Sequence, residues 1–165
     1  MTQDTRWVSF AHKALAISLL VPEGWTITEP ADNQIRFFGP EQPDYNNYQP
    51  TWSITAHRPN GFGDQWFTSL GENSLKTLQE EFEEFVLRST DRFMISSLTE
   101  VQAFWYQWQP EPTLAFAQVQ AYVSVDRYRL YLINGATLTP LAETYLPIFD
   151  NMLKSLRILP TYPSE

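Results

Sequence analysis

Alternating side chains dominate three successive segments of the chain and constrain its fold more than any other feature. The segments cover residues 102–109, 114–125 and 128–134, and short turns at 110–112 and near Asp126 separate them. A period of two places successive side chains on opposite faces of a β-strand. Turns this short join neighbouring antiparallel strands. We therefore predict an antiparallel hairpin array in this part of the chain.

The side chains on the faces of these strands differ in size. Phe104, Tyr106 and Trp108 share one face of the first segment, and we interpret them as core residues. The odd positions of the second segment are all small or β-branched, which predicts a smooth face against which a helix lies closely. These positions are Ala115, Ala117, Val119, Ala121, Val123 and Val125.

Earlier segments also show strand patterns. Leu15, Ile17, Leu19 and Val21 alternate onto one face, and a turn signal at residues 22–24 follows them. The expected strands are 6–10, 15–21, a short extended piece at 25–28, 34–38, 51–58 and a candidate at 93–97. Residues 39–50 hold several prolines and asparagines and predict a loop.

Two segments have helical periodicity. The first covers residues 64–88 and begins either near Leu70, after a capping box, or at an earlier turn capped by Asp64. The second begins near Thr139, and Pro147 within it predicts a kink or a restart. The apolar stripe of the first helix is Leu75, Leu78, Phe82, Phe85 and Val86.

The order of these elements predicts an α+β fold, an α/β/α sandwich with a central, mostly antiparallel sheet. Several strands are apolar on both faces, so we expect helices on both sides of the sheet. The chain of 165 residues fits one domain, 1–165, with its core at about 6–159 and a frayed tail at 160–165.

Composition excludes several classes of function. The absence of cysteine excludes disulfides, zinc–thiolate sites, iron–sulfur clusters and thiol nucleophiles. A formal net charge of −8 disfavours nucleic acid and anionic lipid as partners. The apolar run at 14–21 is too short to span a bilayer. The N-terminus does not resemble a signal peptide, so we expect a soluble cytoplasmic protein unless a leader was trimmed.

The sequence contains no recognisable catalytic, metal-binding or cofactor-binding motif. The Gly-Phe-Gly at residues 61–63 indicates a turn. We interpret His12 and His57 as surface histidines, and the glutamates within 80–84 as a solvated helix face. We therefore expect a protein that is not an enzyme and has no cofactor.

Three aromatic residues are candidates for contact with a protein partner. Tyr45 and Tyr48 lie on the predicted 39–50 loop, and loops on a rigid scaffold commonly carry binding residues. Trp105 points away from the aligned aromatics of its strand and is the third candidate.

The chain resembles the PsbP-like superfamily in three places. Residues 22–25 read Pro-Glu-Gly-Trp after the first long strand, residues 127–132 end a hairpin array, and residues 147–158 are similar to a closing helix with its Ser-Phe-x-Ile end, Leu156 replacing the Phe. The resemblance covers about 8–159 and implies an α/β/α sandwich. Members include photosystem II extrinsic proteins, a Ran-binding protein, bacterial lipoproteins and chaperones of secreted effectors.

Most members of this superfamily act by binding, so the resemblance favours a non-catalytic binding or assembly module that uses the 39–50 loop and an adjoining sheet edge or groove. A chaperone that shields apolar segments of a client is one alternative. Another is a small-ligand binder or enzyme with a pocket built from His57, tyrosines and scattered carboxylates. We expect a monomer or a homodimer.

Overall fold

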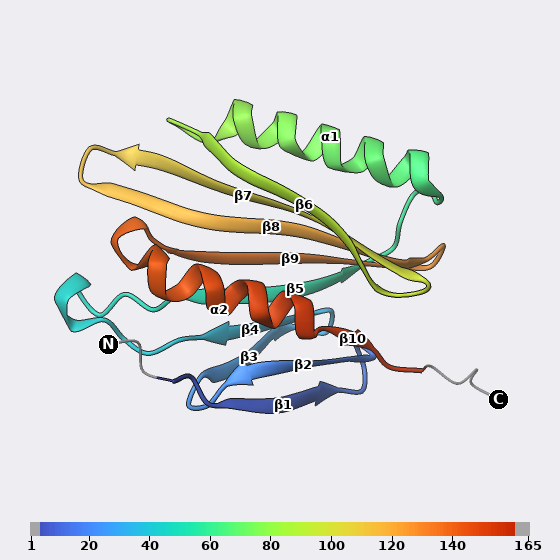
Figure 1. Ribbon diagram of the computed structural model, residues 1–165, viewed down its shortest axis with the longest axis horizontal. Coiled ribbons are helices and arrows are strands. Elements are labelled where there is room, and N and C mark those ends of the chain that lie inside the picture. The colour runs from blue at the N-terminus through green and yellow to red at the C-terminus, as the bar shows by residue number, and fades with distance from the viewer. Residues whose placement is uncertain (1–3, 161–165) are drawn as a thin grey trace.

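Seven antiparallel strands form one twisted sheet through the middle of the molecule (Figure 1). The computed structural model describes residues 4–160. The strand order is β3-β4-β5-β9-β8-β7-β6, so the predicted hairpin array forms one half of the sheet. The strands are β3 (Thr26–Ala31), β4 (Gln34–Phe38), β5 (Thr51–His57), β6 (Val86–Ser96), β7 (Thr99–Glu111), β8 (Leu114–Asp126) and β9 (Arg129–Leu138).

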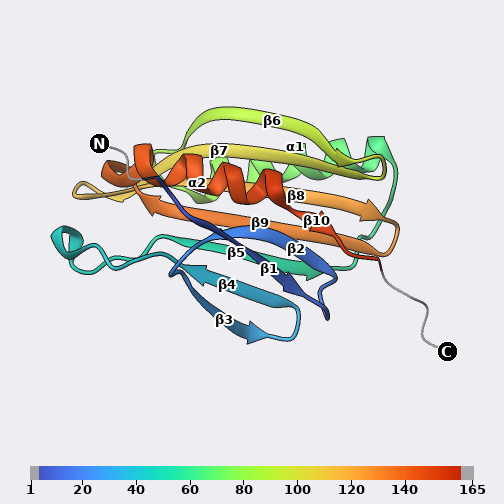
Figure 2. The ribbon, with the colours of Figure 1, turned by 60° about the horizontal axis from the view of Figure 1, so that its bottom comes forward.

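A second, smaller sheet lies on one face of the first. Its order is β1-β2-β10, and all its pairings are antiparallel. Figure 2 shows this sheet beside helix α2, so that the two together cover one face of the large sheet. The strands are β1 (Trp7–His12), β2 (Ile17–Pro22) and β10 (Arg157–Ile158).

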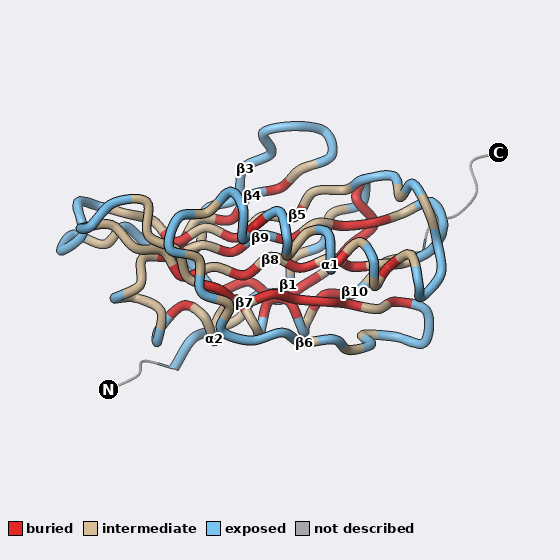
Figure 3. The backbone as a smooth tube through the Cα atoms, turned by 90° about the horizontal axis from the view of Figure 1, so that it is seen from above, coloured by how far each residue is buried: buried red, intermediate tan, exposed pale blue. Residues whose placement is uncertain are grey.

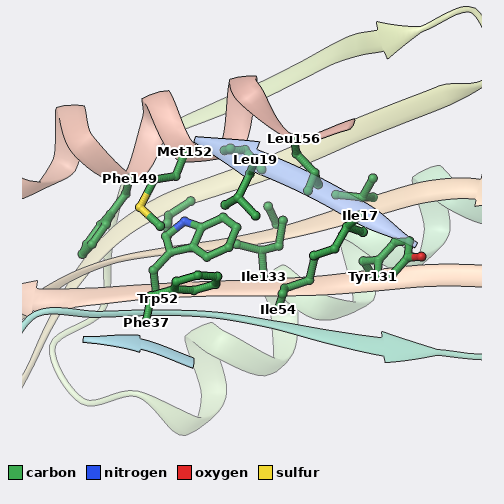
Figure 4. Close-up of a cluster of buried hydrophobic side chains, with 14 of the residues drawn as sticks. Ile17, Leu19, Phe37, Trp52, Ile54, Tyr131, Ile133, Phe149, Met152 and Leu156 are labelled. Carbon is green, nitrogen blue, oxygen red and sulfur yellow. The ribbon is translucent and has the colours of Figure 1, made fainter. Parts of the chain in front are cut away.

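Helix α2 (Ala142–Ser155) packs over β8 and β9 and beside β2. Its buried side chains are Tyr145, Phe149, Met152 and Leu153. The helix approaches closely because Gly135 has no side chain: a Cβ there would lie 2.9 Å from the Phe149 ring. The main core fills this layer, between the large sheet and the α2 side (Figure 4).

Helix α1 (Asp64–Glu81) lies on the other face, over β7 and β8. It buries only Phe67, Gly71 and Leu78. Polar bonds tie it to the sheet: the side-chain amide of Gln102 donates to the Phe67 carbonyl over 2.6 Å. In Figure 3 the buried positions concentrate in the central strands and in α2, and the turns at both ends are exposed.

The structure confirms the predicted α+β sandwich with helices on both faces of an antiparallel sheet. The smooth face of β8 also packs as predicted: Val119, Ala121 and Val123 belong to the main core on the α2 side, and Ala117 is also fully buried.

Several element boundaries differ from the prediction. The first helix begins at Asp64 and ends at Glu81, because Phe82 is extended and Glu84 has a φ of 53°. Strand β6 begins at Val86, inside the 64–88 range predicted for the helix. A 3₁₀ turn, η2 (Thr139–Leu141), precedes α2, and α2 continues through Pro147 as one helix. Of the predicted frayed tail at 160–165, residues 161–165 lie outside the described residues.

Candidate functional site

A cleft of about 910 Å³ lies at one end of the molecule. Its walls come from the start of β1, the turn after β2 and the first two turns of α2, and Pro40 closes one side. In Figure 1 the start of β1, the start of α2 and the cyan loop at 39–50 lie at this end. We call it the aromatic cleft, since Trp7, Trp25 and Tyr145 line it.

The turn after β2 places Trp25 in this cleft. Gly24 has a φ of 88°, a conformation that side chains disfavour, and it turns the chain back toward α2. The Trp25 ring then packs against Tyr145 and Phe149, with centroid distances of 6.3 and 6.5 Å. Gly39 lies beneath the indole, and a Cβ at that position would approach it to 3.2 Å. The Pro-Glu-Gly-Trp sequence at residues 22–25 therefore builds one wall of the cleft.

The 39–50 loop also holds Tyr145, another residue that lines the cleft. The side-chain amide of Gln42 donates to the Tyr145 hydroxyl over 2.8 Å, and it also donates to the carbonyl of Pro40 over 2.9 Å. Burial raises the pKa of Tyr145, and the bond from Gln42 opposes that rise. The hydroxyl is therefore a neutral, oriented group at neutral pH.

The charged groups of the cleft are mainly acidic. Asp4, Glu23 and Glu143 line it together with one guanidinium, that of Arg6. No salt bridge among residues 4–160 involves any of these four side chains. The cleft thus combines aromatic surface with uncompensated negative charge.

The three candidate contact residues do not form one site. Tyr45 is exposed, at the end of the 3₁₀ turn η1 (Pro43–Tyr45). Tyr48 is half-buried and donates its hydroxyl to the Ala136 carbonyl over 3.2 Å. Trp105 is half-buried on the α2 side of the sheet, where it packs against the main core. None of the three lines the aromatic cleft, although the loop that carries the tyrosines borders it.

A row of aromatic rings lies on the α1 side of the sheet. Tyr48 packs on Phe116, Phe116 stacks on Trp108 at 5.5 Å, and Trp108 stacks on Phe82 at 4.4 Å. Tyr106 continues the row beside Phe82 and is only 3% exposed. The row explains why Tyr48 is held in place: its ring joins the loop to the sheet, and burial raises its pKa to about 12.

The two histidines lie away from the cleft. The Nε2 atom of His12 contacts the carboxylate of Glu29, and its Nδ1 accepts the backbone N–H of Leu15 over 3.1 Å. His57 is exposed at the end of β5. Within residues 4–160, no group of three or more His, Asp or Glu side chains is arranged to hold a metal ion. Over the same range, no helix is long and apolar enough to cross a membrane.

The aromatic cleft was not predicted from the sequence. It joins residues 4–7, 22–25 and 143–151, which are far apart along the chain. The one signal available was the Pro-Glu-Gly-Trp sequence at 22–25, which by itself indicates the fold and not a binding site.

Neither a protein-family model nor a curated protein sequence matches the chain. Solved structures do match it. A protein of unknown function from Pseudomonas aeruginosa, PA94, superimposes with a TM-score of 0.65 and 16% identity over 94% of this chain and 99% of that one. The PsbP protein of the cyanobacterium Synechocystis sp. PCC 6803, CyanoP, gives 0.63 and 12%, covering 94% of both chains. The Ran-binding protein Mog1p of Saccharomyces cerevisiae gives 0.62 and 10%, covering 94% and 97%.

These matches show that the chain has the Mog1/PsbP-like fold. They confirm the predicted resemblance at the level of the fold. Because proteins of varied function share this fold and the identities are low, function must be inferred from the site itself.

Proposed function

We propose that this protein is a non-catalytic protein-binding or assembly module, and that it holds a segment of its partner in the aromatic cleft. The observation that carries the proposal is the cleft: about 910 Å³ of concave surface, with half-buried tryptophan rings at positions 7 and 25. Tryptophan and tyrosine are enriched at the residues that dominate binding energy in protein interfaces.

The surroundings of the cleft suit a binding role. The 39–50 loop borders it, so a partner seated in the cleft can also contact exposed Tyr45. The tight packing of Trp25 on Tyr145 and Phe149 fixes one wall in advance. A fixed wall lowers the entropy lost on binding. The Ran-binding protein among the structural matches gives an example of protein binding on this fold.

The alternative functions have less support. No histidine lines the cleft, and no hydrogen bond among residues 4–160 joins its carboxylates to a hydroxyl or a base. General acid–base catalysis relies on such positioned pairs. The carboxylates at the rim also suit a polar or charged segment better than the continuous apolar segment that a chaperone shields.

Blocking the cleft tests the proposal. Thr144 is exposed on α2 and lines the cleft, so Thr144→Arg fills the site without disturbing the core. Ser69→Arg places the same side chain on an exposed position of α1 and is the matched control. Partners are captured from the source cells after cross-linking and quantified by mass spectrometry.

We expect a partner that wild type and the α1 control recover equally and that Thr144→Arg loses at least about tenfold, which corresponds to about 1.4 kcal/mol. Equal recovery by all three proteins would refute the cleft as the binding site. A separate Tyr45→Ala/Tyr48→Ala variant reports on the loop: unchanged recovery would remove the two tyrosines from the interface.

A further inference from the structure

Two half-buried indole rings line the aromatic cleft. They belong to Trp7 and Trp25, and part of each indole remains accessible. The Trp25 ring also contacts Tyr145 and Phe149, and Gly39 lies beneath it. A cation within about 6 Å of an indole face is attracted by the ring quadrupole, and tryptophan is the best of the aromatic side chains for this contact.

The charged side chains around these rings also favour a cationic ligand. Three carboxylates and one guanidinium line the cleft, and no salt bridge among residues 4–160 neutralises any of them. The chain as a whole has a formal net charge of −8. A concave surface with walls of low dielectric constant concentrates such a field, so the cleft should attract a positive ligand.

Two positively charged features of the cleft disfavour a positive ligand, and nearby carboxylates offset both of them. The first turn of α2 faces the cleft, and a helix N-terminus has a partial positive charge. Glu143 lies in that first turn and offsets this charge. The second feature is Arg6, whose single positive charge is outnumbered by the carboxylates of Asp4, Glu23 and Glu143.

We infer that the aromatic cleft recognises an arginine or lysine side chain on a segment of the protein partner. The inference rests on the proposed function and adds the chemistry of the ligand. The volume of about 910 Å³ is near the upper end of the roughly 300–1,000 Å³ range of ligand sites. The cleft therefore has room for the cationic side chain and for the residues on either side of it.

A matched pair of peptides tests the inference without a known partner. One peptide carries arginine at the centre of a neutral Gly/Ser sequence, and the other carries citrulline, which has nearly the same shape but no charge. Binding to ¹⁵N-labelled protein is followed through the indole N–H signals of Trp7 and Trp25, each assigned with its Trp→Phe variant. The other four tryptophans serve as internal references.

We expect the arginine peptide to shift the signals of Trp7 and Trp25 selectively and the citrulline peptide to bind at least about fivefold more weakly. Glu23→Gln and Glu143→Gln should each weaken the arginine peptide about two- to fivefold, and added salt should do the same. Glu72→Gln, on exposed α1, removes one equal charge away from the cleft and should leave binding unchanged.

Equal binding of the two peptides would overturn the inference, and so would the absence of selective shifts at Trp7 and Trp25. Neither result contradicts the proposed function, because the Thr144→Arg capture experiment measures recovery of the whole partner and does not require the ligand to be cationic. Conversely, equal partner recovery in that experiment would refute the protein-binding role even if the arginine peptide bound.

Discussion

The close approach of α2 to the sheet depends on Gly135, and Gly135→Ala tests it directly. Gly135 lies on β9 opposite Trp52 of β5 and Val119 of β8. The added Cβ would lie 2.9 Å from a ring carbon of Phe149 and 2.9 Å from a methyl group of Val119. Because Phe149 is fully buried, its ring has no free space to move into.

The structure sets the expected magnitude. Overpacking a dense core by one methyl group costs about 1–3 kcal/mol of unfolding free energy. For a chain of this length each kcal/mol lowers Tm by about 2–4 °C, so we expect a decrease of about 2–12 °C. Phe149→Leu removes the ring edge that the new methyl group meets. The double variant should therefore be more stable than the sum of the single effects predicts, with a coupling energy of about 0.5–3 kcal/mol.

Urea denaturation followed by circular dichroism measures all three variants, and an unchanged m-value indicates a change in stability alone. Asn134→Ala, at the neighbouring exposed position of β9, is the matched control and should stay within about 0.5 kcal/mol of wild type. A Gly135→Ala protein as stable as wild type, or strictly additive single effects, would refute the close packing of α2 on β9.

Three further predictions follow from contacts described above. Tyr131→Phe removes a buried hydroxyl that donates to the Leu15 carbonyl and should lower the unfolding free energy by about 1–2 kcal/mol in urea denaturation; no change would exclude a stabilising bond. Gln102→Leu leaves the Phe67 carbonyl without its donor and should increase amide hydrogen exchange in α1 more than in β9; equal increases would show that this hydrogen bond does not hold α1 on the sheet. Burial raises the pKa of Tyr48 to about 12, so the folded protein holds this proton more tightly than the unfolded chain, in which tyrosine titrates near 10. The unfolding free energy should therefore fall as pH rises above about 10, and Tyr48→Phe should make that fall less steep; an identical slope would show that Tyr48 is not buried.

The strands were predictable because their signal is local. The alternation at residues 114–125 defines both faces of β8, and the structure places its small face against α2 as expected. The C-terminal end of α1 was not predictable in the same way. Phe82 and Phe85 continue the apolar period of the helix, but they leave it to join the aromatic row beside Tyr106. The spacing of apolar residues along the sequence is the same whether the last of them extend the helix or pack beyond its C-terminal end.

Long-range assembly limited the prediction of the site. The aromatic cleft needs Trp7, Trp25 and Tyr145 together, and only tertiary packing brings these three residues to one cleft. Strand β10 has only two residues, too few for a periodic signal, yet its pairing with β2 closes the small sheet. The loop tyrosines illustrate the converse: Tyr48 had the sequence context of an exposed contact residue, but its ring packs on Phe116.

The two helices are attached to the sheet to very different degrees, and this difference divides the molecule into two tiers of stability. Helix α2 shares the main core, whereas α1 buries three residues and depends on a few polar bonds. Detaching α1 would therefore expose little apolar surface and would leave the layer between α2 and the sheet intact. Such an opening needs less free energy than global unfolding, so the protein can fluctuate on one side while the opposite side stays rigid.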